Sequence, residues 1–204
     1  MTYDVRPMTM TFLFYFSILY NYSVQYSKMY HRKYSLYIIY IMDEDNALSD
    51  EQIYKIFREH KKYKIQHPNI IEMDKITKYK NINQIFNNQG HAIVFIRYPG
   101  EKIGHWTTLL RHDGEIYFFD SLGYSLNHYD KQKYISKLAK KEGYKVRSNR
   151  IKFQSDDTNV CGRYSLMMAM FNKLHLSNDD IDKLLKHIKR EYKNIDNFLL
   201  ECRI

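Results

Sequence analysis

The stretch Gln154-Ser155-Asp156-Asp157-Thr158-Asn159-Val160-Cys161-Gly162 joins a basic segment to an apolar one and holds one of the two cysteines of the chain. Cys161 stands where a polar loop turns into a helical pattern that runs to Leu174. A thiol at a helix N-terminus faces unpaired backbone N–H groups and the positive end of the helix dipole, and both favour the thiolate. We therefore predict that Cys161 is a nucleophile; the alternative is a small thiol that only fills the core.

Two upstream segments, Gly104-His105-Trp106 and Phe118-Phe119-Asp120-Ser121-Leu122-Gly123, supply a candidate base and a candidate acid. The pattern predicts a strand over 105–111, a tight turn at 112–114 and a returning strand over 115–120. With the turn centred on Asp113, position 105 lies opposite position 120 or 121. Asp120 is then placed to fix the tautomer of His105 and to stabilise its charged form.

Three further residues complete the predicted site. The side-chain amide of Gln154 can donate to the oxyanion of a tetrahedral intermediate, together with the backbone N–H of Cys161. Gly162 has no side chain, so it lets a substrate backbone come close. Trp106 stands beside the base and can wall the site from water. We therefore predict Gln154 as catalytic, and Trp106 and Gly162 as substrate-binding.

These segments, in this order, resemble the adenain and ubiquitin-like-protein-specific protease group of cysteine peptidases, over Leu48 to about Leu185. The resemblance implies the base, orienting, oxyanion and nucleophile roles for His105, Asp120, Gln154 and Cys161. It implies a small papain-like fold and cleavage of peptide or isopeptide bonds near small or glycine residues. Arg163 departs from the pattern, because relatives often have an apolar residue after Cys-Gly.

The periodicity predicts an α+β fold, in which a mostly antiparallel sheet packs on a central helix that carries the nucleophile, with peripheral helices around it. A capping box at Ser49 and Gln52 predicts a helix that contains Ile53, Ile56 and Phe57. We expect further strands over 92–96 and 144–153, a short helix from Asn81, and helices over 132–141, 163–174, 178–190 and 191–200.

Composition and length suit one domain over residues 42–204. Residues 1–41 differ, because they hold nine of the 20 tyrosines and no glycine. This extension is a membrane-touching leader, a peripheral addition or a stretch absent from the mature protein, and we favour the last. Its apolar run, 12–20, is shorter than the roughly 20 residues that a membrane span needs, so no stable span is expected. Two cysteines suit a reducing compartment, and no spacing predicts a metal site.

The net charge of +9 is concentrated between 131 and 152, where Glu142 is the only acid. Such a segment suggests contact with a nucleic acid, although charge alone is the least specific sign of it. The candidate contact residues are Lys131, Lys133, Lys137, Lys140, Lys141, Lys145, Arg147, Arg150 and Lys152.

We expect a monomeric viral maturation protease that processes virion precursor proteins in the virion and the infected-cell interior. Composition rich in Lys, Asn, Ile and Tyr suits an AT-rich viral genome. A polypeptide is the expected partner, no cofactor is required, and DNA is an optional activator by the resemblance. Two alternatives stay open: a protease that removes SUMO-like or ubiquitin-like modifiers, and a non-catalytic basic domain that binds nucleic acid.

Overall fold

A mixed sheet of five strands lies at the centre of the described structure, in the order β1-β2-β3-β4-β5. The strands are β1 (Asn69–Glu72), β2 (His91–Arg97), β3 (Gly104–His112), β4 (Glu115–Phe119) and β5 (Lys145–Ser148). β2, β3 and β4 pair antiparallel, whereas β1 with β2 and β4 with β5 pair parallel. The α+β class is confirmed, and the two outer pairings are parallel where we expected mostly antiparallel ones.

The computed structural model describes residues 47–59, 66–100, 103–173, 176–191, 195–196 and 199. The chain divides into two compact units, Met1–Tyr40 and Ile41–Ile204. The first unit lies outside the described residues, so the extension expected over 1–41 stays a prediction. All elements named here belong to the second unit, and none of its described helices is long and apolar enough to cross a membrane.

The β3–β4 hairpin carries two candidate residues, and its register differs from the expected one. Asp113-Gly114 forms a two-residue turn with positive φ at both positions, 45° and 75°, which matches the twist of paired strands. Thr108 pairs with Phe119 in the resulting register. Asp120, the next residue, therefore stands diagonal to His105 on the same face of the hairpin, where we expected it directly opposite.

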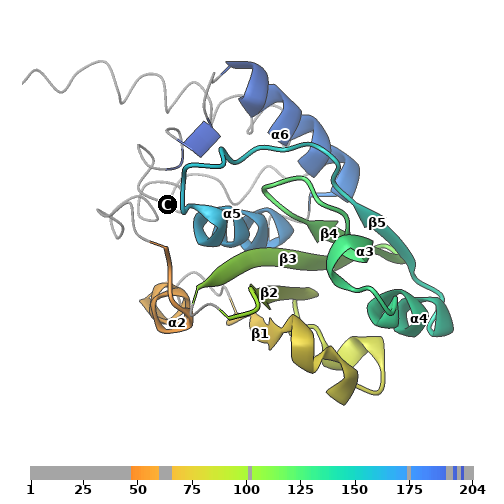
Figure 1. Ribbon diagram of the computed structural model, residues 1–204. Helices are drawn as coiled ribbons and strands as arrows, with labels where there is room; N and C mark the ends of the chain where they lie inside the picture. The colour runs from red at the N-terminus through yellow and green to blue at the C-terminus, as the bar shows by residue number, and fades with distance from the viewer. Residues whose placement is uncertain are drawn as a thin grey trace, which may run out of the picture. The chain divides into compact units, whose positions relative to one another are not determined.

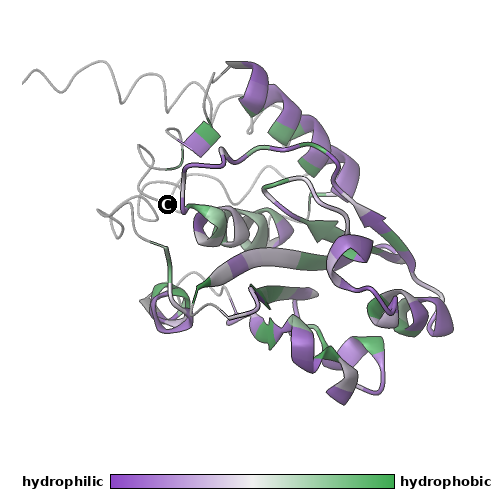
Figure 2. Cartoon of the chain, in the orientation of Figure 1, coloured by the Kyte–Doolittle hydropathy of each residue, from purple (hydrophilic) through white to green (hydrophobic). Residues whose placement is uncertain are grey.

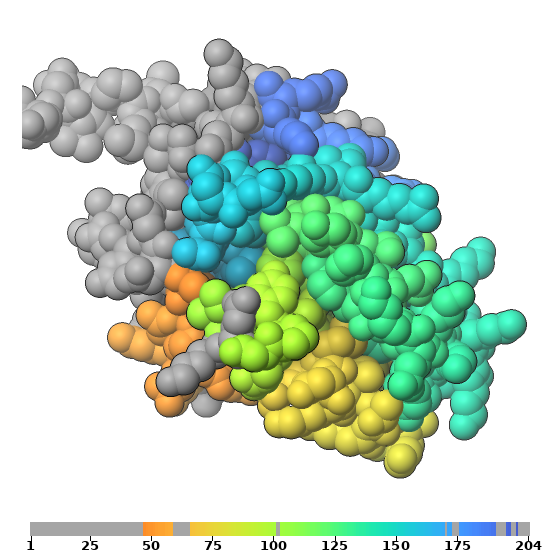
Figure 3. Space-filling model, viewed as in Figure 1, coloured from red at the N-terminus to blue at the C-terminus, as the bar shows by residue number. Residues whose placement is uncertain are grey.

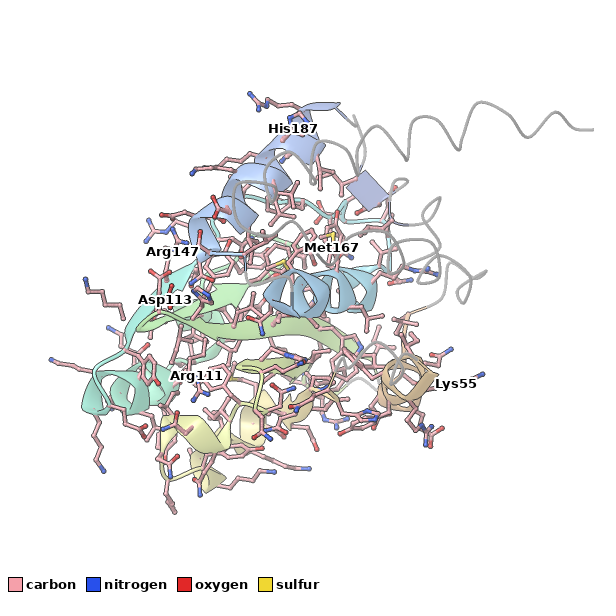
Figure 4. The ribbon with its side chains drawn as sticks, turned by 180° about the vertical axis from the view of Figure 1, so that it is seen from behind. Lys55, Arg111, Asp113, Arg147, Met167 and His187 are labelled. Carbon is pink, nitrogen blue, oxygen red and sulfur yellow. The ribbon has the colours of Figure 1, made fainter. Side chains whose placement is uncertain are left out.

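Helices cover both faces of the sheet (Figure 1). On one face, α5 (Cys161–Lys173) and α6 (Asn178–Glu191) share an apolar core with Leu110 and Tyr117 of the hairpin. Met167 on α5 belongs to this core (Figure 4). The amphipathic α6 shows hydrophobic patches among hydrophilic ones (Figure 2), and buries Ile181, Leu185 and Ile188 at helical spacing.

The opposite face is covered by two 3₁₀ helices, η3 (Met73–Lys78) and η4 (Ile82–Gln84), and by α3 (Leu126–Tyr129) and α4 (Tyr134–Lys141). Leu109 and Phe118 pack there, because side chains alternate along each strand. A third apolar cluster joins α2 (Asp50–Glu59) to Trp106 near the start of β3 and to Cys161 at the start of α5. That cluster fixes the end of the sheet where the candidate site lies.

Local signals located most of the predicted elements. The capping box is present, since the Gln52 N–H donates to Ser49 Oγ at 3.2 Å and the Ser49 N–H to Gln52 Oε1 at 2.8 Å. The strand expected over 144–153 is wrong in extent, because β5 ends at Ser148. Phe153 instead donates its N–H to the Ser121 carbonyl. β1, η3 and α3 were not predicted, and the helix expected over 191–200 lies largely outside the described residues.

Candidate active site

Cys161 is the first residue of α5, and 6% of it is exposed. The helix begins here because the Val160 carbonyl accepts from the N–H groups of Arg163 and Tyr164, at 3.0 and 3.1 Å. None of the residues in this first turn is acidic, so the turn adds no negative charge to the positive end of the helix dipole. The thiol therefore lies at the start of a buried helix, where the sequence predicts it; Arg163 is itself 1% exposed.

His105 and Asp120 form a buried pair beside this thiol. The Nε2 atom of His105 lies 2.7 Å from Asp120 Oδ1, and the two side chains are 3% and 0% exposed. The Cys161 thiol is the other side chain that interacts with this ring. Because Nε2 faces the carboxylate, Nδ1 is the nitrogen left for the thiol. The structure thus brings three predicted residues into one line of contacts.

Opposing effects act on the pKa of His105. Burial lowers it, but hydrogen bonds with Asp120 and with Cys161 raise it by more, to about 9. The ring is therefore cationic at neutral pH and can stabilise a thiolate on Cys161. A thiol, an imidazole and a carboxylate in this order are the parts of an activated sulfur nucleophile.

Further hydrogen bonds hold Asp120 in place. Its Oδ1 accepts from the Leu122 N–H and its Oδ2 from the Tyr129 hydroxyl, both at 2.8 Å. The side chain of Asn149 makes two hydrogen bonds with the backbone of Asp120. Its Oδ1 accepts from the Asp120 N–H and its Nδ2 donates to the Asp120 carbonyl, both at 2.7 Å. Sequence reasoning missed Tyr129 and Asn149. Nothing local marks Tyr129, and Asn149 carries only the faint signal of an amide inside a predicted strand.

Gln154 is held in the loop that leads to Cys161, and 5% of it is exposed. Its Oε1 accepts from Ser121 Oγ at 2.6 Å, and its Nε2 donates to the Thr158 carbonyl at 2.7 Å. A primary amide has two N–H donors, and this bond uses one of them. The predicted oxyanion donor is therefore oriented by its neighbours and keeps a second N–H for a ligand.

The two residues predicted to bind substrate both contact Leu48. Trp106 is 5% exposed, packs on Phe95 with ring centroids 4.6 Å apart, and donates its indole N–H to the Leu48 carbonyl at 2.7 Å. A Cβ at Gly162 would lie 2.9 Å from Leu48 Cβ. The close approach that we expected from a substrate backbone at Gly162 is thus made by Leu48. Leu48 directly precedes the Ser49 capping box, a position that ordinarily packs on the fourth residue of its own helix, here Ile53, so no sequence signal pointed to its contact with Gly162.

The basic segment is exposed, with one exception. Eight of its nine lysines and arginines are exposed, and the side chains of α4 and β5 project from the right-hand side in Figure 3. Arg147 differs: it lies between β5 and α6 (Figure 4), 3.4 Å from Glu115, 2.6 Å from Asp179 and 3.6 Å from Asp182. These carboxylates engage the guanidinium of Arg147 within the fold, and the contact of the basic segment with nucleic acid stays a prediction. Lys152 pairs with Asp156 at 2.5 Å.

Within the described residues, no cluster of His, Cys, Asp and Glu could hold a metal ion. No family model and no curated protein matches the chain. Among solved structures, the selenomethionine form of the ASFV pS273R protease is similar, with a TM-score of 0.48 and 13% identity over 79% of this chain and 68% of that one. A second structure of the ASFV pS273R protease gives a TM-score of 0.43 and 14% identity, over 72% and 67%. Likenesses this distant say nothing of this chain's chemistry, which its own side chains must supply.

Proposed function

We propose that the chain is a cysteine peptidase. The observation that carries the proposal is the His105 ring, which lies 2.7 Å from the Asp120 carboxylate and also interacts with the Cys161 thiol. A carboxylate that orients and charges an imidazole, which in turn holds a thiolate, gives a strong nucleophile at neutral pH. The location of the thiol at a helix start adds to this activation.

In the proposed reaction, Cys161 Sγ attacks the carbonyl carbon of the scissile peptide bond. The carbonyl oxygen becomes an oxyanion, which accepts hydrogen bonds from the Gln154 amide and the Cys161 backbone N–H. His105 gives its proton to the leaving amine as the C–N bond breaks, and a thioester remains on Cys161. Water then loses a proton to His105 and hydrolyses the thioester, which restores the thiolate and the imidazolium.

We propose that the residues next to the cleaved bond are small, with glycine foremost. Cys161 and His105 are only 6% and 3% exposed, so a slim backbone reaches them more easily than a branched side chain. Leu48 already fills the space above Gly162. The family resemblance described above agrees with this preference.

A virion precursor protein is the substrate that we propose, with activity in the virion and the infected-cell interior. The support is the order of the motifs and the Lys-, Asn-, Ile- and Tyr-rich composition. A modifier-removing protease would use the same catalytic residues. Cleavage of a Gly-X-Gly virion-type peptide, and not of a Gly-Gly modifier fusion, is the expected result; the reverse preference would favour deconjugation.

A thiol probe tests the peptidase proposal directly. In a Cys202→Ala background, which leaves one cysteine, the probe is expected to label the protein at Cys161. Labelling should vanish in Cys161→Ala and drop in His105→Ala, because the imidazolium no longer stabilises the thiolate. Equal labelling of the His105→Ala protein, or a wild type that cleaves no peptide, would contradict the proposal.

The non-catalytic alternative makes a different prediction about the basic segment. Lys137, Lys140 and Lys141 are exposed on and at the end of α4. If they contact DNA, changing all three to glutamate should weaken DNA binding and flatten its salt dependence, because fewer counterions are released. DNA binding without thiol labelling would support the silent domain, whereas DNA-stimulated cleavage that the triple variant loses would make DNA an activator.

A further inference from the structure

Asp196 holds the loop that leads to the nucleophile. Its side chain is fully buried and accepts hydrogen bonds from Ser155, Thr158 and Tyr164 among the described residues. Its Oδ2 accepts from the Ser155 N–H at 2.7 Å and the Thr158 hydroxyl at 2.8 Å, and its Oδ1 accepts from the Tyr164 hydroxyl at 2.9 Å. A buried carboxylate needs such donors to offset its lost hydration, so the donors and the carboxylate fix one another.

The three donors lie on both sides of the nucleophile in the chain. Ser155 and Thr158 precede Cys161 in the loop, and Tyr164 follows it on α5. Burial, and then the nearby Asp196, raise the pKa of Tyr164, so its hydroxyl keeps its proton and donates. One carboxylate therefore ties the loop to the helix at the point where the chain passes from one to the other.

The same loop orients the proposed oxyanion donor. The Gln154 Nε2 donates to the Thr158 carbonyl, and the Thr158 hydroxyl donates to Asp196. Without the carboxylate, Thr158 loses the partner that fixes its place, and the amide of Gln154 loses a fixed acceptor. The hydrogen bonds among His105, Asp120 and Cys161 do not pass through this loop side chain, so the activation of the thiol is independent of it.

We propose that Asp196 is a positioning residue, which sets the oxyanion donors without activating the thiol. The inference rests on the proposed peptidase function. It predicts that loss of Asp196 separates two properties of the enzyme: stabilisation of the oxyanion, which falls, and reactivity of the Cys161 sulfur, which stays.

The test compares peptide cleavage with iodoacetamide alkylation in a Cys202→Ala background. In alkylation the sulfur forms a bond to carbon as iodide leaves, so no oxyanion develops and Gln154 has no part. In Asp196→Ala, kcat is expected to fall by about 10- to 10²-fold, and the alkylation rate of Cys161 to stay within about twofold. Adding Gln154→Ala to this variant should lower kcat only a little further, because both changes weaken the same hydrogen bond from Gln154 to the oxyanion.

Two gentler variants cover the case in which Asp196→Ala does not fold. Thr158→Val and Tyr164→Phe each remove one hydrogen bond to Asp196, and each should lower kcat by a smaller factor. Tyr117→Phe is the matched control, since Tyr117 is also a buried tyrosine that donates to an aspartate, Asp182 on α6. It should lower the melting temperature and leave kcat unchanged.

Three results would overturn the inference: an unchanged kcat in folded Asp196→Ala, an equal fall of kcat and alkylation rate, or an equal fall of kcat in the control. A failure of the peptidase proposal looks different. There the wild type itself cleaves no peptide, and both proposals fall together.

Discussion

The charge on Asp120 is expected to set the pH range in which the protein is active. Asp120→Asn removes that charge and keeps the shape of the side chain. The backbone stays clamped by Asn149, and an asparagine oxygen can still accept from His105 and Leu122. Its amide nitrogen takes the position of Oδ2 and can donate to the Tyr129 hydroxyl oxygen. The change is therefore electrostatic with little effect on the geometry.

Two buried histidines give the magnitude. His91 is 0% exposed, its ring nitrogens have no hydrogen-bond partner in the part of the chain that the structure describes, and burial lowers its pKa to about 4. His105 is 3% exposed, yet its pKa is raised to about 9, since its bonds to Asp120 and Cys161 outweigh burial. The difference, about 9 minus about 4, is roughly five pH units or about 7 kcal/mol. If Asp120 supplies about half, the pKa of His105 falls by about two to three in the variant.

The assay is the pH dependence of kcat/KM for peptide cleavage. In the wild type, activity is expected to fall at high pH along a limb near pH 9, where the imidazolium loses its proton. In Asp120→Asn this limb should move to about pH 6–7, so the protonated fraction of His105 and with it the rate at pH 7 should drop by about two- to tenfold, and by more at higher pH. The limb belongs to the Cys161–His105 pair and not to one residue. A variant that keeps both its rate and its limb would refute the reasoning.

Three more variants probe the surroundings of the site. His91→Leu should raise the free energy of unfolding by about 1–3 kcal/mol at neutral pH, because it removes buried, unpaired ring nitrogens. The pKa of His91 in the folded protein, about 4, lies below its ordinary 6.5, so the wild type loses stability as the pH falls from 6.5 towards 4. In urea unfolding, the free energy of unfolding of the leucine variant should not show this decrease with falling pH. The same decrease in both proteins would contradict the prediction. Gly162→Ala places a Cβ 2.9 Å from Leu48 Cβ, which should cost about 1–3 kcal/mol in urea unfolding and be partly relieved by Leu48→Ala. Tyr129→Phe removes a donor to Asp120, leaving the carboxylate a better partner for the imidazole, so the basic limb of the pH profile should stay or rise; a fall of that limb would show that the hydroxyl acts otherwise.

Local sequence patterns predicted those elements of the fold whose partners lie close to them in the sequence. The hairpin follows from the Asp113-Gly114 turn and the apolar residues on either side of it, and α2 follows from its capping box. β1 could not be found this way, because its partner β2 begins about twenty residues later and pairs parallel with it. β5 ends at Ser148, and the side chain of the next residue, Asn149, hydrogen-bonds with the backbone of Asp120, a contact that no local pattern indicates.

The residues of the candidate site likewise fall into those that local spacing predicted and those that only tertiary contacts reveal. Spacing around Cys161, together with the hairpin, was enough to propose His105 and Asp120 as its neighbours. Residues that act by reaching across the fold gave no such signal: Tyr129 needs α3 to be placed beside the hairpin, and Asp196 needs the last described helical turn to meet the loop. Their roles depend on tertiary packing, which no short motif encodes.

The carboxylate beneath the loop has a consequence for the timing of activity. Synthesis proceeds from the N-terminus, so the sulfur and the oxyanion donors leave the ribosome before Asp196 does. At that stage the nascent chain carries every reacting group but still lacks Asp196, which positions the oxyanion donors. Until Asp196 emerges and docks, peptide cleavage by the nascent chain is expected to be about 10- to 10²-fold slower than by the complete fold, as in Asp196→Ala.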